Sequence, residues 1–128
     1  MSPPAPDTDA AAYVASVLML YVNLPETPLR ASVQDQWQAR RLYDRHTPLH
    51  LVETALMLGS LRRLIRPTDV PPLPPVRSLA YFLPVIDELL VQPAPDNYRE
   101  YLRLKLHRLA EATGMPAKVQ KNAFSDDR

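Results

Sequence analysis

Hydrophobic residues recur along most of the chain with the three-to-four-residue spacing of an α-helix, and prolines separate the apolar runs. No stretch alternates between apolar and polar residues over enough positions to predict a sheet. The pattern therefore predicts an all-α fold: a compact bundle of about five helices with a proline-rich connector, built as a single domain from residues 7–114. Residues 1–6 are expected to form a loose leader and residues 115–128 a mobile tail.

Capping signals predict where each helical run begins, because Ser, Thr and Asp side chains accept hydrogen bonds from free backbone N–H groups. Gly114 follows the last run, as glycine often does at a helix end. The runs are expected to cover approximately residues 8–22, 33–45, 48–66, 79–90 and 97–113. The N-cap candidates in chain order are Asp7 or Thr8, Ser32 with Asp35 completing a capping box, Thr47 ahead of Pro48, Ser78 and Asp96.

Proline shapes two further segments of the chain. Residues 66–77, RPTDVPPLPPVR, indicate a stiff connector with polyproline character between the third and fourth runs. Pro84 falls inside the fourth run, so we expect either a kink at that point or a helix that begins near Phe82.

The third run is apolar on nearly every side, which predicts a helix at the centre of the bundle. Together with the second run and the short turn RHTP, it resembles a DNA-binding helix-turn-helix. In that motif the second helix presents polar side chains to base edges in the major groove, and a helix buried in a bundle has no such face. The sequence therefore argues against major-groove recognition by the third helix.

Trp37, the only tryptophan, falls largely opposite the inner stripe of the second run, which consists of Ala39, Leu42 and Tyr43. Arginines and glutamines surround it on the outer side. Tryptophan is buried on average, so packing under the first helix or the proline connector is the first interpretation. The other is an exposed binding anchor, because Trp and Arg dominate protein interface hot spots and an indole beside guanidinium groups stacks on unpaired bases.

The formal net charge of the chain is +1, yet its charges are unevenly distributed. Residues 30–66 carry seven arginines against three carboxylates, a net charge of +4, and residues 99–128 carry a net charge of +3. Basic stretches of this kind suit contacts with phosphates, although arginines at the end of the third run also simply complement the helix dipole. The predicted nucleic-acid-binding residues are Trp37, Arg40, Arg41, Arg45, Arg62, Arg63 and Arg66.

A second candidate surface lies on the fifth run. Tyr101, Leu104 and Arg108 point away from the inner stripe that includes Leu102 and Leu106. We interpret these three residues as a candidate partner-binding surface for another protein or for a second copy of the chain.

The chain carries no recognisable catalytic constellation. It has no cysteine, which excludes a disulfide framework, a thiol nucleophile and a cysteine-ligated metal. His46 and His50 have i,i+4 spacing, but the helix break between them spoils the shared face that zinc needs. Asp87 and Glu88 are adjacent and diverge on a helix, so they are poor candidates for paired acid–base work. We expect no enzymatic activity, and the sequence implies no metal or cofactor.

The most apolar stretch, residues 10–22, does not have the features of a membrane segment. It is shorter than the roughly 20 apolar residues that span a bilayer. Acidic residues precede it where a secretory signal carries basic ones. We therefore expect a cytoplasmic protein without a membrane partner.

Residues 32–90 resemble small helical modules found near replication and mobile-element genes in bacteria. The shared run is a capped helix with an A-x-x-L core, a short turn, a long apolar helix and then S-L-x-Y-F before an acidic-apolar helix. The segment is also similar to helical DnaD-like primosome domains, whose last helix carries a Tyr followed by an Ile. Tyr81 and Ile86 match those positions, whereas Leu89 and Leu90 stand where the family has Trp. The resemblance implies DNA replication or remodelling, with single-stranded DNA and a replication protein as partners.

Two hypotheses of function follow from these patterns. The leading one is a non-enzymatic helical accessory module that binds nucleic acid through phosphate contacts while Trp37 stacks on bases. The alternative is a protein–protein adaptor or homodimerisation module that uses Trp37 or the surface around Tyr101. The near-neutral total charge suits a protein partner better than a polyanion.

Overall fold

The computed structural model describes residues 6–65, 69–71 and 73–112. Over these residues the chain forms five α-helices and one short 3-10 helix, with no strand, so the prediction of an all-α helical bundle is confirmed. The predicted leader, apart from Pro6, lies outside the described residues, as do Gly114 and the predicted tail. Pro6 itself is the first residue of the first helix.

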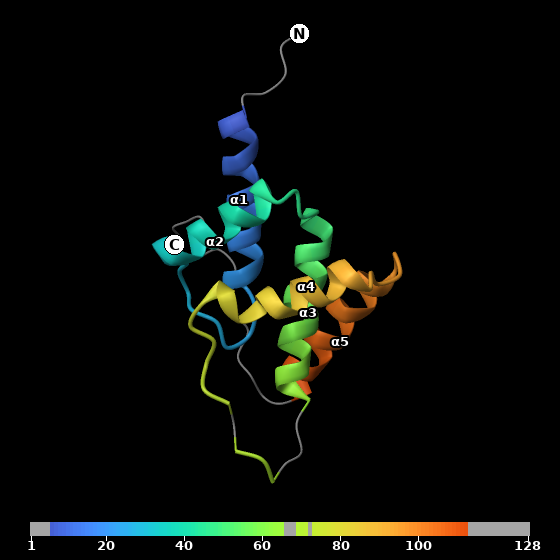
Figure 1. Cartoon of the computed structure of the whole chain (residues 1–128). Coiled ribbons are helices and arrows are strands. Elements are labelled where there is room, and N and C mark those ends of the chain that lie inside the picture. Colours follow the sequence, from blue (N-terminus) through green and yellow to red (C-terminus); the bar gives the residue numbers. More distant parts are fainter. Residues whose placement is uncertain (1–5, 66–68, 72, 113–128) are drawn as a thin grey trace, which may run out of the picture.

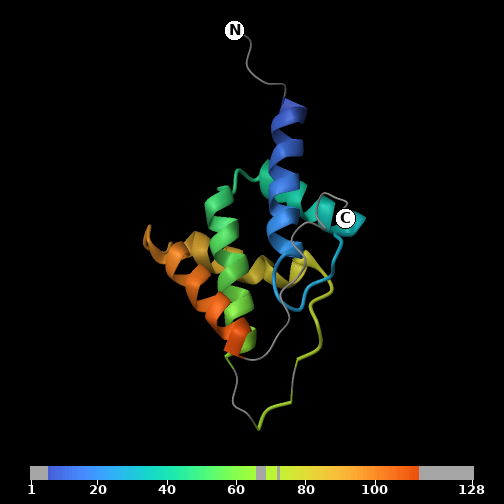
Figure 2. The same ribbon diagram turned by 180° about the vertical axis from the view of Figure 1, so that it is seen from behind.

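The helices assemble around the third of them. α3 contacts α1, α4 and α5 as well as the 3-10 helix, while α2 packs on α1. Figure 1 and Figure 2, which view the molecule from opposite sides, both place α5 alongside α3, and α2 and α5 on opposite sides of α3. The elements in chain order are α1 (Pro6–Val22), α2 (Val33–Asp44), α3 (Leu49–Leu64), η1 (Leu79–Phe82), α4 (Leu83–Val91) and α5 (Tyr98–Ala112).

α3 is buried in its middle, where every residue from Thr54 to Leu61 is buried. The prediction of a central helix is confirmed. The exposed residues of α3, among them His50 and Arg62, lie near its two ends, so the helix has no continuous exposed face to place in a major groove. Gly59 permits a close approach of Phe82 to α3, because a Cβ atom at this position would lie 2.7 Å from Cδ1 of Phe82. The aromatic ring of η1 therefore occupies the space that any other side chain at this position would need.

The predicted capping box at the start of α2 is present. Ser32 Oγ accepts a hydrogen bond from the Asp35 backbone N–H at 3.1 Å, and Asp35 accepts one from the Ser32 N–H at 2.9 Å. The other carboxylate oxygen of Asp35 accepts a bond from the Leu79 N–H at 2.9 Å. Asp35 is only 1% exposed. One carboxylate therefore caps α2 and also fixes the beginning of η1 against it.

The start of α3 differs by one residue from the prediction. Pro48, not Thr47, is the N-cap, and no side chain caps the helix. Thr47 instead belongs to the turn, because its N–H donates to the Leu42 carbonyl at 3.0 Å and its own carbonyl accepts from the Tyr13 hydroxyl at 2.7 Å. His46 completes this turn with a positive φ of 61°. The bonds to Leu42 in the preceding helix and to Tyr13, 34 residues away, therefore override the local capping preference of Thr47.

Pro84 lies in the first turn of α4, whose N-cap is Phe82. Of the two outcomes expected for this proline, the structure shows the helix that begins near Phe82. Proline is tolerated there because the first N–H groups of a helix have no partner within the helix. In the part of the chain that the structure describes, no helix is both long and apolar enough to cross a bilayer.

Candidate functional site

Trp37 lies at the centre of the side of α2 that points away from the bundle. Its side chain is 65% exposed, and that of Val33, one turn earlier, is 64% exposed. The residues of α2 that pack inward are Asp35, Ala39 and Leu42. Packing of Trp37 under α1 or the connector, the first interpretation from the sequence, is therefore wrong. The stripe that faces α1 lies on the opposite side of the helix from the indole.

Two arginines continue the surface around Trp37. Arg40 and Arg41 follow it by three and four residues, which places them on the same side of α2. Arg40 pairs with Asp44, with 3.1 Å between Nε and Oδ1, whereas Arg41 is exposed and makes no ion pair within the described residues. We call this surface the outer face of α2; it consists of Val33, Trp37, Arg40, Arg41 and Asp44. Its first half is apolar and its second half carries the charge.

Arg45 and Arg62 are exposed as predicted, but each pairs with a carboxylate of α4. Arg45 Nη2 lies 3.4 Å from Asp87 Oδ1. Arg62 reaches both oxygens of Glu88, with 3.0 Å between Nη1 and Oε2. Its hydrogen bonds lower the pKa of Glu88 below the usual value. These pairs are weak on an exposed surface, yet each one occupies an arginine that was predicted to meet a phosphate.

The prediction that Arg63 binds nucleic acid differs most from the structure. Its side chain is 4% exposed. It donates to Glu26 Oε1 at 2.9 Å and to the Pro74 carbonyl at 2.6 Å, and its guanidinium carbon lies 5.2 Å from the centre of the Tyr81 ring. Arg63 fastens the proline connector to α3 and has no access to a phosphate, so its assignment as a binding residue is wrong. Arg66 lies outside the described residues.

The residues proposed on α5 do face outward. Tyr101 is 53% exposed and Leu104 is 51% exposed, and Arg108 is exposed as well. The Tyr101 ring stacks on that of Tyr98 at 5.9 Å between centroids. The two helices that carry this surface and the outer face of α2, α5 and α2, lie on opposite sides of α3 in both views (Figure 1, Figure 2).

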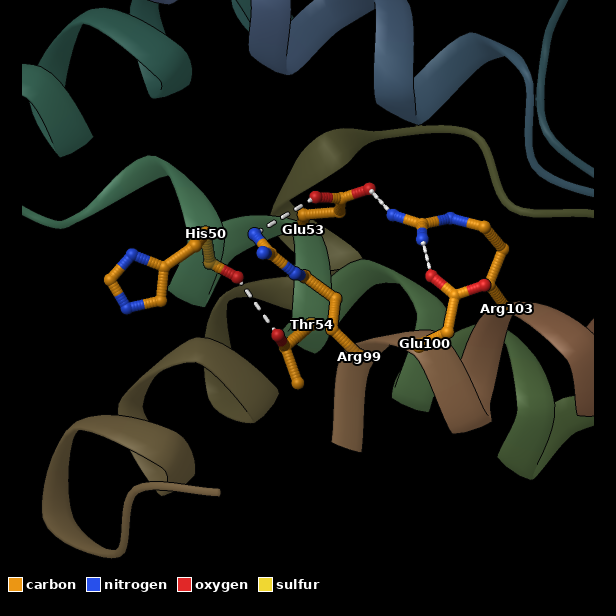
Figure 3. A network of polar contacts seen from close by, with 6 residues as sticks. All are labelled: His50, Glu53, Thr54, Arg99, Glu100 and Arg103. Carbon is orange, nitrogen blue, oxygen red and sulfur yellow. Dashed lines mark hydrogen bonds and ion pairs between the residues drawn. The ribbon is translucent and has the colours of Figure 1, made fainter. Parts of the chain in front are cut away.

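The structure also shows a polar network that the sequence did not predict. Glu53 of α3, whose side chain is 19% exposed, is approached by two arginines of α5 (Figure 3). Arg103 Nη2 lies 2.8 Å from Glu53 Oε2, and Arg99 Nη1 lies 3.4 Å from Oε1. Arg103 also donates to Glu100. The i,i+4 spacing of the two arginines was visible in the sequence, but their shared partner lies about one third of the chain away.

A groove of about 670 Å³ opens beside this network, between α1 and α3. Ala15, Met19, Leu20 and Leu49 give it apolar walls, and Arg99 with Glu53 forms a polar border. A second hollow of about 310 Å³ shares Arg99 with the first. Among the described residues, no cluster of three or more His, Asp or Glu side chains is placed to hold a metal ion.

Two surface features thus stand out from the rest of the molecule: the outer face of α2 and the groove beside Arg99. The first contains residues that the sequence singled out, and the second contains residues that it did not. Comparison of the chain with protein-family models, with curated proteins and with solved structures gives no match.

Proposed function

We propose that this protein is a non-enzymatic adaptor that binds a partner protein through the outer face of α2. The exposed position of Trp37 carries the proposal. Trp37 is 65% exposed. A large apolar ring on the solvent side of α2 adds nothing to the packing of that helix on α1. Tryptophan and arginine are the residues most enriched in interface hot spots, and here they occupy one side of one helix.

The charge of this face selects the kind of partner. Arg41 is exposed and makes no ion pair in the described chain, while Arg40 pairs with Asp44 and its guanidinium lies over the ring of Tyr43. A partner that offers carboxylates next to apolar side chains would bury Trp37 and Val33 and satisfy Arg41. An acidic, amphipathic segment of another protein has this chemistry.

A second copy of the chain fits the same face less well. In an antiparallel pair of α2 helices, the arginines of one copy would lie opposite the first turns of the other. The carboxylate in those turns belongs to Asp35, which is 1% exposed and already bonded to Ser32 and Leu79. In a parallel pair, arginine would face arginine. A different protein is therefore the better occupant.

Nucleic-acid binding is a second candidate for the same surface, in the replication context that the sequence resemblance implies. The observation that favours it is the exposed indole of Trp37 with Arg41 one turn away, because a base stacks on an indole while a guanidinium contacts the phosphate. Three ion pairs weigh against it. At Arg40, Arg45 and Arg62, a phosphate would have to displace a carboxylate.

Affinity capture with matched surface variants tests the proposal. The bait is the whole chain as wild type, as Trp37→Ser/Arg41→Ser and as the control Tyr101→Ser/Leu104→Ser, with the lysate used before and after nuclease treatment. We expect wild type and the control to retain the same acidic protein, the α2 variant to lose it, and nuclease to change nothing. Loss of the protein with the α5 variant, or its retention by the α2 variant, would place the interface elsewhere.

Nuclease treatment of the lysate and a direct titration distinguish protein binding from nucleic-acid binding. Single- and double-stranded oligonucleotides are added to the protein at low and then at moderate salt while the emission of Trp37 is followed. The adaptor proposal predicts unchanged emission. Quenching that weakens steeply with salt would instead support nucleic-acid binding, because phosphate contacts release counterions.

A further inference from the structure

Arg99 is the less completely bonded of the two arginines that approach Glu53. Arg103 donates to Glu53 at 2.8 Å and to Glu100, whereas the bond that Arg99 makes to Glu53 is 3.4 Å long. A guanidinium carries five N–H donors, so Arg99 has donors to spare. Its side chain is also 39% exposed. Figure 3 shows the two arginines approaching Glu53 from the same helix, each at a different oxygen.

The groove that Arg99 borders is mostly apolar on the side of α1, where Ala15, Met19 and Leu20 line it together with Ser16. Leu49 and His50 line it from α3. The groove measures about 670 Å³, and small-molecule sites in proteins typically measure between about 300 and 1,000 Å³. Arg99 also borders the second hollow. A cation at the edge of an apolar groove matches a ligand that combines an anionic end with an apolar body.

We propose that this groove binds small carboxylates with an alkyl or aryl body, and that Arg99 holds the carboxylate. A planar carboxylate accepts two parallel N–H bonds from one guanidinium, which a spherical anion does not. The apolar body would lie along Met19, Leu20 and Leu49, where an inorganic anion gains nothing. This site shares no residue with the outer face of α2, so the proposed carboxylate binding does not depend on the proposed adaptor function.

The network allows Arg99 to leave Glu53 for a ligand without leaving the Glu53 carboxylate unpaired. When Arg99 turns toward a ligand, Glu53 keeps its shorter bond to Arg103. That bond also raises the pKa of Arg103 above its ordinary value, so Arg103 stays charged. A half-buried carboxylate that lost its sole partner would resist such a movement, whereas Glu53 has a second one. Arg103 therefore holds Glu53 while Arg99 binds the ligand.

Calorimetric titration of the whole chain tests this proposal with decanoate as the probe. Decanamide has the same apolar body without the charge and serves as the matched ligand. Arg99→Gln removes the proposed anchor, and Arg108→Gln is the matched control, because Arg108 is exposed on the same helix and neither pairs with Glu53 nor lines the groove. Wild type and Arg108→Gln are expected to bind decanoate, and Arg99→Gln to bind it about tenfold more weakly or worse, the loss typical of a charged hydrogen bond.

A spectroscopic readout locates the ligand. The methyl resonance of Met19 should shift with decanoate in wild type, while exposed methyl groups such as those of Val91 should not. Equal affinity for decanoate and decanamide would overturn the proposal, as would equal decanoate affinity in wild type and Arg99→Gln. Absence of decanoate binding by wild type at millimolar concentration would overturn it too.

Discussion

Buried Arg63 is the clearest case of a side chain whose role is set by distant residues. Its contacts reach Glu26, Pro74 and Tyr81, which lie in three different segments of the chain. Glu26 adopts a positive φ of 63°, and its carbonyl accepts a hydrogen bond from the Val76 N–H at 2.8 Å. Arg63 and this backbone bond together attach the connector to the loop that follows α1.

Replacing Arg63 by methionine should therefore destabilise the fold rather than impair binding. The change leaves the Glu26 carboxylate and the Pro74 carbonyl without their partner, which typically costs about 3 kcal/mol of unfolding free energy. Urea denaturation of Arg63→Met measures the loss. Arg62→Met is the control on the exposed side, and its loss should be a small fraction of that figure. Equal losses in both variants would contradict a structural role for Arg63.

The Tyr13 hydroxyl should make stability depend on pH in the alkaline range. It donates to the Thr47 carbonyl at 2.7 Å, and burial raises the pKa of Tyr13 from the usual 10.0 to about 12. The folded state thus holds the proton more tightly than the unfolded chain does. The stabilising contribution is complete below pH 10 and disappears as the pH rises toward 12.

Absorbance titration of the tyrosines checks this pH dependence. The pKa of Tyr21 is also raised, mainly by burial and to a smaller extent by the negative charge of Asp35. Tyr13 and Tyr21 should therefore ionise only together with unfolding. Tyr13→Phe should remove one delayed step. Ionisation of Tyr13 and Tyr21 near pH 10 in a protein that remains helical would contradict the raised pKa values.

The Tyr21 hydroxyl illustrates a local imperfection of the core. The residue is fully buried, and its hydroxyl has no hydrogen-bond partner among the described residues. Its ring packs edge-on against Phe82 at 6.1 Å between centroids. Tyr21→Phe keeps that packing and removes the unpartnered group, so it should raise the free energy of unfolding by about 1 kcal/mol. Thermal denaturation that shows a clear loss of stability would reveal a partner for the hydroxyl.

At the scale of the elements, the contact between α3 and η1 depends on Gly59. In an isolated helix, alanine at this position would be better than glycine by about 1 kcal/mol. Here the added Cβ would lie 2.7 Å and 2.9 Å from two carbons of the Phe82 ring. That ring is fully buried and cannot swing away, because Tyr21 and Tyr81 pack on it edge-on.

Gly59→Ala should therefore reduce stability instead of increasing it. Overpacking of this kind costs about 1–3 kcal/mol, which exceeds the gain in helix propensity. Guanidinium denaturation gives the comparison with wild type. Ser60, the next residue of α3, is also buried, and Ser60→Ala serves as the control because it removes an atom from the core where Gly59→Ala adds one. A more stable Gly59→Ala protein would show that η1 packs on α3 less closely than described.

Elements governed by neighbouring residues could be predicted from the sequence, and those governed by distant residues could not. The capping box of Ser32 and Asp35 acts within one turn and was correctly predicted. For Pro84 the sequence left open a kink or a helix that begins near Phe82, and the structure shows the second. The start of α3 was misplaced because Leu42 and Tyr13 hold Thr47 in the turn. Arg63 was misassigned for the same reason, since its partner Glu26 is 37 residues away.

The same distinction holds for the candidate site. Helical periodicity placed Trp37 opposite the inner stripe of α2, yet it did not reveal whether another element covers that side. Exposure of the indole is a property of the assembled bundle, in which α1 packs on one side of α2 only. The groove beside Arg99 depends on three helices at once. No pattern within one helix indicates it.

For the molecule as a whole, the distribution of charge argues against a surface built for polyanions. The arginines that the structure describes within residues 30–65 are spread over several faces of the molecule. Arg63 is buried, and Arg45 and Arg62 are bound to carboxylates of α4. What remains beside Trp37 is a small basic patch with an apolar half. A patch of this composition fits a protein surface better than a nucleic-acid backbone.

Acrylamide quenching of Trp37, the only tryptophan, tests this account most directly. The measurement is made on the free protein, on the protein with a single-stranded oligonucleotide and on the complex with the captured partner. The account predicts ready quenching in the first two samples, because the indole is 65% exposed, and protection in the third. A shielded indole in the free protein, or protection by the oligonucleotide alone, would contradict it.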